Sequence, residues 1–392
     1  MSWPQRKLGE IMPKRTGSIN PSKFENETFE LYSIPSFDVN QPEIIKGAEI
    51  GSSKKLVQPG DILLSKIVPH IRRCWIVPEV NGLRQIASGE WIIFRSSDVN
   101  GEFLKYFLTS DVFHSKFIST ISGVGGSLMR ARPSEVEKID YPFPPLPVQK
   151  QIAAVLEKAD TLRSQCQQME QELNSLAQSV FLDMFGDPVA NPKGWPIKKF
   201  KDIGSAQLGK MLSAKSKQGE NPKKYLRNAN VRWRKIELHD LLEMDFNEKE
   251  MNKFGLEYGD LLVCEGGDVG RCAIWREELS DCYYQKALHR VRVNKDIVKP
   301  EYVQEYFYWM STLGGLLASV SEVTFSHLTA AKMAELNVPV PPIGLQEDYI
   351  KKINVINESL KNIEESKAAY EQSFNSLMQR AFKGELDLKD VA

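Results

Sequence analysis

Two stretches of the chain carry apolar residues at alternating spacings of three and four, which predicts long helices that each pack along one stripe. The first helix is expected to end before Gly186 and the second before Gly384, since glycine commonly terminates helices. The first stripe consists of Ile152, Val155, Ala159, Leu162, Cys166, Met169, Leu173, Leu176 and Val180. The second consists of Tyr349, Ile353, Ile356, Leu360, Ile363, Lys367, Tyr370, Phe374, Leu377 and Ala381. The strict spacing favours helix-on-helix packing, with packing of each helix on its own globular module as the alternative.

Shorter apolar runs precede each helix and predict strands. Residues 62–64 and 261–263 follow Gly-Asp pairs and are expected to be buried strands. Residues 91–94 and 288–293 are expected to be strands as well. Aromatic and aliphatic residues at helical spacing follow in 102–119 and 301–318. Each half of the chain therefore predicts an α+β module of roughly 145 residues followed by a helix.

The two halves repeat one another in sequence. Residues 139–149 (IDYPFPPLPVQ) reappear as residues 336–346 (LNVPVPPIGLQ). Trp-Pro pairs, Gly-Asp pairs and an Asn-Ser-Leu-x-Gln-x-x-Phe motif also recur in the same order, at offsets between 192 and 201. Such order indicates an internal duplication. In the helices, 24 residues separate Ile152 from Leu176 and 28 separate Tyr349 from Leu377, so the second copy is predicted to hold one additional turn.

The composition is that of an ordinary globular protein. The 392 residues are 42% hydrophobic and 26% charged, and no run of 18 apolar residues predicts a membrane span. The start of the chain lacks an apolar segment of signal-peptide type. Five cysteines without a Cys-x-x-Cys spacing indicate free thiols and no zinc site or disulfide framework. We therefore expect a cytoplasmic protein.

Charge is unevenly distributed although the net charge is zero. Residues 193–235 contain 13 Lys or Arg against two acids, and residues 237–260 are acidic on balance. A local basic patch in a neutral protein is compatible with a directional DNA-binding face. A solvated surface without a ligand explains the same charges, and composition alone does not separate these interpretations.

Motifs for catalysis are incomplete or missing from the sequence. Residues 204–210 approach a phosphate-binding loop, but Met211 stands where a magnesium-binding hydroxyl is needed. Asn191-Pro192-Lys193 is not the Asn/Asp-Pro-Pro-aromatic motif of an adenine methyltransferase. No zinc-protease or serine-hydrolase motif occurs, and the five histidines have no metal-ligand spacing. We expect a non-catalytic chain with no cofactor and no metal.

The helices suggest a geometry for binding. If they pair antiparallel, the two modules lie at opposite ends of a seam of about 28 residues, which is roughly 42 Å long. At about 3.4 Å per base pair this length exceeds one turn of duplex DNA. Two similar modules at that separation would suit a bipartite DNA site with an unread gap.

A Pro-x-Pro-Pro-[Leu/Ile]-x-x-Gln segment before a long helix, present twice, resembles the specificity subunit of type I restriction-modification systems. The Gly-rich segment 265–271 (EGGDVGR) resembles a turn common in that family; the first module has 65–73 (SKIVPHIRR) at this place. The resemblance covers essentially the whole chain. It implies two target recognition domains with small twisted β-sheets and helices, related by a pseudo-two-fold duplication and separated by two helices that form an antiparallel coiled coil. The implied boundaries are 1–147 for recognition domain 1, 148–190 for the central spacer, 191–344 for recognition domain 2 and 345–392 for the distal spacer.

The resemblance also implies partners: double-stranded DNA with a bipartite site, two methylation subunits and two restriction or motor subunits. A coiled-coil adaptor that binds proteins and a self-contained restriction or modification enzyme are the alternatives. The basic segment disfavours the adaptor, and the missing cofactor and nuclease motifs disfavour the enzyme.

Candidate DNA contacts are basic, amide and hydroxyl side chains in the loops of both modules, since such groups bind phosphates and base edges. They are Lys66, Arg72, Arg73, Ser127, Arg130 and Arg132 in module 1, and Arg227, Asn228, Asn230, Arg232, Arg234, Arg271, Lys286 and His327 in module 2. The glycines of segment 123–127 could let the backbone approach a phosphate, or could form a plain flexible loop.

Overall fold

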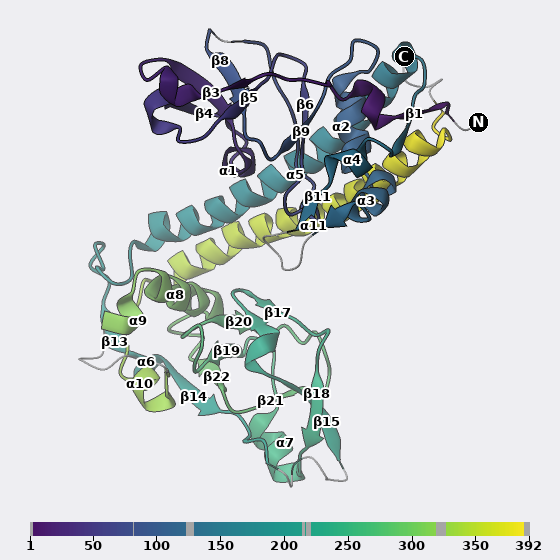
Figure 1. Ribbon diagram of the computed structural model, residues 1–392. Coiled ribbons are helices and arrows are strands. Elements are labelled where there is room, and N and C mark those ends of the chain that lie inside the picture. The colour runs from purple at the N-terminus through teal and green to yellow at the C-terminus, as the bar shows by residue number, and fades with distance from the viewer. Residues whose placement is uncertain are drawn as a thin grey trace. The chain divides into compact units, whose positions relative to one another are not determined.

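The chain forms two compact units, each of which holds one mixed α/β module and parts of two long helices (Figure 1). The computed structural model describes residues 3–80, 82–122, 129–213, 216, 221–318 and 327–387. Unit 1 comprises Met1–Met169 and Ile363–Ala392, and unit 2 comprises Glu170–Asn362. The long helices are α5 (Leu146–Phe185) and α11 (Ile343–Lys383).

The module of unit 1 is built around buried strands. Strand β6 (Ile62–Ser65) lies between β7 (Cys74–Ile76) and β9 (Trp91–Phe94), and β6 and β9 are fully buried, which confirms the predicted strands. A second sheet has the order β2-β5-β8-β3-β4. Its strands are β2 (Ser18–Ile19), β3 (Thr28–Tyr32), β4 (Glu43–Lys46), β5 (Lys54–Leu56) and β8 (Arg84–Ala87). Other strands pair as β1 (Gln5–Lys7) with β12 (Asp140–Pro142) and β10 (Ile121–Ser122) with β11 (Arg130–Ala131).

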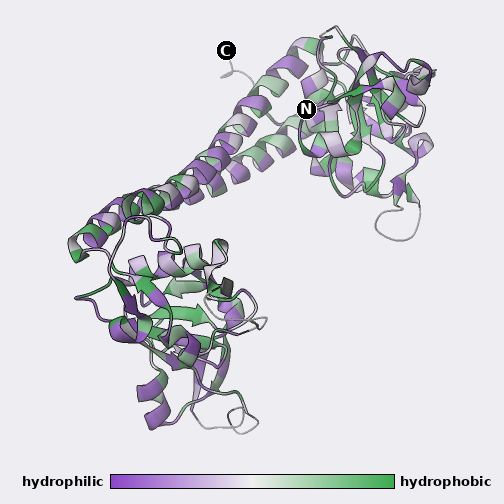
Figure 2. Cartoon of the chain, turned by 90° about the vertical axis from the view of Figure 1, so that its left-hand side faces the viewer, coloured by the Kyte–Doolittle hydropathy of each residue, from purple (hydrophilic) through white to green (hydrophobic). Residues whose placement is uncertain are grey.

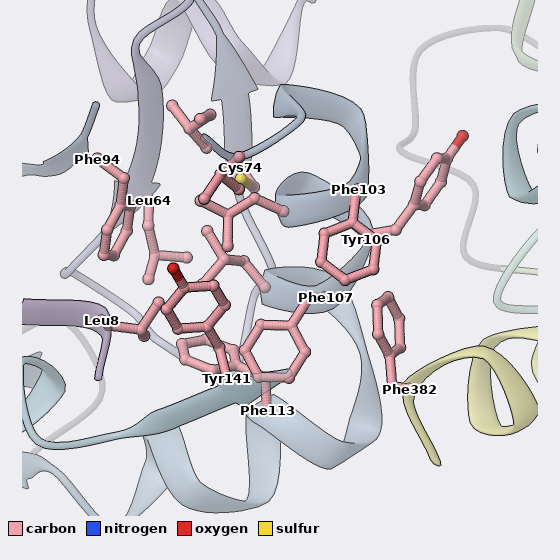
Figure 3. Packing of buried hydrophobic residues seen from close by; sticks show 14 of the residues in the cluster. Leu8, Leu64, Cys74, Phe94, Phe103, Tyr106, Phe107, Phe113, Tyr141 and Phe382 are labelled. Carbon is pink, nitrogen blue, oxygen red and sulfur yellow. The ribbon is translucent and has the colours of Figure 1, made fainter. Parts of the chain in front are cut away.

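Short helices accompany the β6 sheet. They are α1 (Ile34–Asp38), α2 (Gly101–Thr109), α3 (Asp111–Ile118) and α4 (Pro133–Val136), with short 3-10 turns at Leu8–Ile11, Pro21–Lys23 and Gly47–Glu49. One of them, α2, packs on β6 and β7 and contacts α11. Phe103 and Phe107 of α2 lie against Phe382 of α11, with ring centroids 5.6 and 5.4 Å apart (Figure 3). Each such aromatic pair adds about 0.5–1.5 kcal/mol beyond its buried area. The module and the end of α11 therefore share one core.

Unit 2 repeats the plan with different detail. Its main sheet has the order β14-β22-β19-β20, formed by β14 (Gly204–Leu208), β19 (Leu261–Cys264), β20 (Cys272–Ile274) and β22 (Leu288–Val293). Other strands are β13 (Ile197–Lys199), β15 (Pro222–Leu226), β16 (Val231–Arg232), β17 (Lys235–Ile236), β18 (Leu242–Asp245), β21 (Tyr283–Tyr284) and β23 (Asn337–Pro339). Helices are α6 (Phe200–Ile203), α7 (Glu248–Phe254), α8 (Pro300–Thr312), α9 (Gly315–Ala318) and α10 (Ala330–Ala334), with a 3-10 turn at Asn228–Asn230. The strands predicted at 261–263 and 288–293 are confirmed, and residues 204–208 form a strand where the sequence approached a phosphate-binding loop.

The repeated Pro-Pro-Gln segment has a structural role in both units. The side-chain carbonyl of Gln149 accepts from the backbone N–H of Asn100 at 2.8 Å, and that of Gln346 accepts from Lys299 at 2.8 Å. Each amide nitrogen donates at 2.8 Å to the carbonyl of the proline five positions earlier. Both glutamines are fully buried. The motif therefore fastens the first turn of each long helix to the loop that precedes α2 or α8.

The repeated Gly-Asp pair is explained by a buried carboxylate that pairs with a half-buried arginine. Arg95 donates two hydrogen bonds of 2.6 Å to Asp61, and Arg292 donates bonds of 2.7 and 3.0 Å to Asp260. The hydrogen bond to the carboxylate raises the pKa of both guanidinium groups. The glycine before each Asp has a φ of +83° or +91°, a conformation that favours glycine. The same turn and ion pair therefore precede both central strands, β6 and β19.

The long helices run antiparallel where they meet. In unit 1, Ile152 and Leu156 of α5 share a core with Met378 and Phe382 of α11, and Arg163 further along α5 pairs with Glu371 further back along α11 at 3.3 Å. Residue numbers therefore increase in opposite directions along α5 and α11. In unit 2, the end of α5 meets the beginning of α11 through Phe185 and Tyr349, whose ring centroids are 5.3 Å apart.

The predicted stripe is confirmed on α11, whereas on α5 it is confirmed at six of nine positions and wrong at three. Every predicted α11 position is buried or half-buried. On α5, Leu162, Met169 and Leu176 are 37%, 50% and 48% exposed, while the residue after each is half-buried. The guanidinium of Arg163 lies 4.4 Å from the ring centroid of Phe374, so a cation–π contact and an ion pair occupy a place that an apolar pattern assigns to the neighbouring leucine.

The helices α5 and α11 are 40 and 41 residues long, and the predicted additional turn is found only in the spacing between equivalent anchors. Phe181 stacks on Tyr302 of α8 as Phe382 packs on Phe103 of α2. Gln149 and Phe181 are 32 residues apart, and Gln346 and Phe382 are 36 apart. Hydrophobic and hydrophilic residues are interspersed along both helices (Figure 2), while the central strands β6, β9 and β19 are mostly apolar.

Candidate nucleic-acid interface

The loop after β6 in module 1 is held by a defined set of backbone contacts. The N–H of Lys66 donates to the carbonyl of Glu90 at 3.0 Å, and the carbonyl of Lys66 accepts from Ala131 at 2.8 Å. Ile67 forms a β-bridge with Arg130. The turn before β9 and the strand β11 are thereby fixed beside the end of β6.

Module 2 has the same backbone contacts after β19. The N–H of Glu265 donates to the carbonyl of Ala287 at 2.9 Å, its carbonyl accepts from Leu328 at 2.6 Å, and Gly266 forms a bridge with His327. The frame therefore makes four positions equivalent between the modules. The pairs are Lys66 and Glu265, Ile67 and Gly266, Glu90 and Ala287, and Arg130 and His327. The backbone is kept while the side chains differ in charge and size.

In module 1 this place holds a cluster of charges. Nζ of Lys66 lies 3.7 Å and Nε of Arg130 3.4 Å from the same carboxylate oxygen of Glu90. Lys55 donates to the carbonyl of Trp91 at 2.7 Å, and burial together with the charge of Lys66 lowers the pKa of Lys55. Three cations around one acid leave a net positive surface, which suits a phosphate backbone.

In module 2 the same place is a hollow of about 560 Å³. It is lined by Met211, Leu212, Asn228, Glu265, Gly266, Gly267, Gln285, Lys286, Ala287 and His327. Three of the predicted contacts, Asn228, Lys286 and His327, thus share one concave surface. Lys286 is exposed, and no ion pair joins it to the part of the chain that the structure describes.

Arg271 supports this hollow from beside it. Its guanidinium donates to the carbonyl of Asn228 at 3.1 Å and lies 3.7 Å from Asp268, and the side chain is only 15% exposed. The amide of Asn228 in turn donates to the carbonyl of Gly266 at 2.9 Å. The side-chain carbonyl of Asn228 and Nε of Arg271 are buried without a hydrogen bond to the described residues. Arg271 therefore holds the Gly-rich turn against Asn228.

The other predicted residues of segment 227–234 make internal contacts of different kinds. Arg227 pairs with Asp240 at 2.6 Å, and the more exposed Arg232 lies 3.1 Å from Glu237. Asn230 is 2% exposed and bonds only backbone groups through its side chain. Arg234 makes two 2.6 Å bonds to Glu305; burial would lower its pKa, but Glu305 raises it above the usual value. Asn230 and Arg234 hold the fold together.

The remaining candidates of module 1 lie at different places. Arg73 is 8% exposed and makes two bonds, of 2.7 and 2.8 Å, to Asp38, whose pKa this hydrogen bonding lowers. Arg72 pairs with Asp111 at 2.5 Å on the side of α3. Arg132 is exposed and donates to the carbonyl of Thr120 at 3.3 Å, close along the chain to Arg130. Ser127 lies outside the described residues.

The duplicated frame corresponds to a known family. The family model described as "Type I restriction modification DNA specificity domain" matches residues 2–175 and again residues 192–369. The chain belongs to this family. Its two matches follow the two copies of the repeat, so each copy is one specificity domain.

Relatives of this specificity-domain chain are distant in sequence. The specificity subunit of the type I restriction enzyme EcoKI from Escherichia coli (strain K12) is 24% identical over 306 residues, a match that covers 72% of this chain and 65% of that subunit. The match thus spans slightly less than two thirds of the relative's length. The MjaVIII specificity subunit of Methanocaldococcus jannaschii is 23% identical and is covered to 64%.

Solved structures share the fold of the whole chain. A structure describing complex assembly and conformational transition of the type I R-M system contains a chain with a TM-score of 0.62 and 18% identity, and the match covers 98% of both chains. The S subunit of the type I system from M. genitalium gives a TM-score of 0.58 at 12% identity, covering 97% of this chain and 96% of the other. The α+β fold with two recognition domains and an antiparallel helix pair is therefore shown.

Four residues at these two places, Lys55, Glu90, Met211 and Leu212, were not predicted from the sequence as DNA contacts. Glu90 and Lys55 carry no motif, and acids were not considered as DNA contacts. Met211 and Leu212 are 62% and 41% exposed in the hollow, although apolar residues are normally assigned to the core. Aligning the two repeats at the turn before β9 and β22 would have exposed the Glu90 position. Within the described ranges, no three metal-binding side chains gather at one point, and no helix combines the length and apolarity needed to cross a bilayer.

Proposed function

We propose that this chain is the DNA-reading specificity subunit of a type I restriction-modification complex, with each module reading one half of a bipartite site. The observation that carries the proposal is the shared backbone frame after β6 and β19. That frame presents Lys66, Glu90 and Arg130 in one module and an open, partly apolar hollow in the other. A constant frame with divergent side chains is what reading two unlike half-sites requires.

The proposed contacts divide by chemistry. Lys66, Arg130 and Arg132 in module 1, and Lys286 and Arg232 in module 2, are placed to bind phosphates or base edges. Asn228 and His327 line the hollow and are proposed to reach base edges. Arg271 positions Asn228 through the hydrogen bond to its carbonyl, while Arg72 and Arg227, paired with Asp111 and Asp240, are proposed as phosphate contacts. Arg73, Asn230 and Arg234 are left out because their side chains bond internally.

The chain is proposed to recognise DNA without carrying out chemistry. Two methylation subunits would dock on the helix pair, and two restriction or motor subunits would complete the enzyme, which would act in the cytoplasm. The exposed apolar residues of α5, Leu162, Met169 and Leu176, support a covered helix surface. Methylation and cleavage would then belong to the partner subunits.

The proposal is tested by co-expressing the chain with methylation subunits in cells that lack other DNA methylation. Methylome sequencing should yield one bipartite motif that disappears when the chain is removed. An unchanged methylome, together with failure to co-purify with any methylation subunit, would refute the proposal and favour a protein-binding adaptor.

A further inference from the structure

Glu90 stands out because it places a negative charge among cations on a face proposed to approach DNA phosphates. A carboxylate in that position repels the backbone, so its presence needs a compensating contact. We propose that Glu90 reads a cytosine of the first half-site by accepting a hydrogen bond from its N4 amino group. This inference rests on the proposed function and adds a specificity-determining residue to it.

The position of Glu90 is fixed by its backbone. Its carbonyl accepts from Lys66 at 3.0 Å, and its N–H donates to the hydroxyl of Ser88 at 3.3 Å. The side chain is 31% exposed, so a ligand can reach it. The closest approach of both Lys66 and Arg130 is to Oε2, and no hydrogen bond from the described residues reaches Oε1. One oxygen is therefore held by cations while the other is available to a donor.

The chemistry of base edges selects cytosine. An ionised carboxylate can only accept hydrogen bonds. In the major groove cytosine offers its N4 amino donor, whereas guanine offers N7 and O6 and thymine offers O4, all of which are acceptors that repel Glu90. Adenine has a donor at N6, but its neighbouring N7 acceptor faces the second carboxylate oxygen. Lys66 and Arg130 hold the carboxylate in place through Oε2, and can bind phosphates beside it.

Module 2 supplies an internal contrast. The residue equivalent to Glu90 is Ala287, and the cations are replaced by Glu265 and His327. The methyl side chain of Ala287 cannot accept a hydrogen bond from a base. The effect of changing Glu90 is thus confined to the first half-site.

The test uses the complete chain assembled with its methylation subunits. Glu90→Gln keeps size and shape but adds a donor, and a glutamine can bond adenine at N6 and N7 together. Methylome sequencing should show one cytosine of the first half-site become cytosine or adenine, while the second half-site is unchanged. In vitro methylation of single-base variants should show discrimination at that position fall from about 5- to 150-fold to near unity in Glu90→Ala.

A matched control is Glu27→Gln, because Glu27 is 30% exposed and pairs with Arg84 at 3.0 Å in the same module. It should leave the motif intact. The inference is overturned if Glu90→Gln and Glu90→Ala keep the wild-type motif, or if the first half-site contains no cytosine. It is also overturned if both variants slow methylation equally on every sequence, since Glu90 would then only position its cations. A wild-type chain that directs no bipartite methylation would instead refute the proposed function, and this inference with it.

Discussion

Lys286 provides a quantitative prediction about DNA binding by module 2. It is exposed two residues before β22, lines the hollow, and has no ion-pair partner among the described residues. One phosphate contact contributes about 0.9 to the slope of log K against log salt. At 0.1 M salt this corresponds to about eightfold in affinity, or about 1.2 kcal/mol. We expect Lys286→Ala to weaken binding by that factor and to reduce the salt slope by about one.

The assay is fluorescence anisotropy with the assembled methyltransferase and a duplex bearing both half-sites, titrated across a series of salt concentrations. Lys295→Ala is the matched control, because Lys295 is also exposed but follows the other end of β22. The six-residue strand spans about 17 Å, which exceeds the Debye length of about 10 Å at 0.1 M salt. An unchanged slope in Lys286→Ala, or an equal loss in both variants, would refute a phosphate contact at this place.

Other predictions concern the frame. Deleting one four-residue turn from the 349–377 helix should change the permitted gap between half-sites or break assembly; full activity on the original motif would contradict a spacing role. Gln149→Leu and Gln346→Leu should each destabilise the chain by about 2–4 kcal/mol, because buried backbone groups lose their partners, and an unaltered urea midpoint would count against this. Burial raises the pKa of Cys74 and of Cys282 to about 12, so neither thiol should be alkylated by iodoacetamide at pH 8 until the protein is denatured, as mass spectrometry can establish.

The duplication could be predicted because its two repeated motifs, the Gly-Asp turn and the Pro-Pro-Gln junction, depend on the conformation and burial of a few neighbouring residues. The Gly-Asp turn needs a left-handed glycine and a buried carboxylate, and the Pro-Pro-Gln junction needs a buried amide at the start of a helix. The Gly-Asp turn and the Pro-Pro-Gln junction therefore have the same residue types in each copy of the repeat. The central strands were predictable for a similar reason, since residues buried on both faces form continuous apolar runs.

The three exposed positions of the α5 stripe could not be predicted from apolar spacing. Arg163 occupies the seam because Phe374 and Glu371 satisfy it from α11, and those partners lie about 200 residues away in sequence. Leu162 is apolar but points away from that contact. Register between helices depends on the surface opposite, which a pattern within one helix does not contain.

The candidate site was predictable only in part for the same physical reason. Asn228, Lys286 and His327 were expected as DNA contacts and share one surface. Asn230 and Arg234 have the same chemistry in the sequence, yet tertiary partners occupy their side chains. Composition identifies groups able to bind DNA, while long-range pairing decides which of them remain available.

Each module is proposed to read its own half-site. The most direct test replaces residues 1–147 with the corresponding module of another family member and sequences the methylome of cells that carry the hybrid and the methylation subunits. We expect one half of the bipartite motif to change while the other half is kept. A motif that changes in both halves, or in neither, would contradict this proposal.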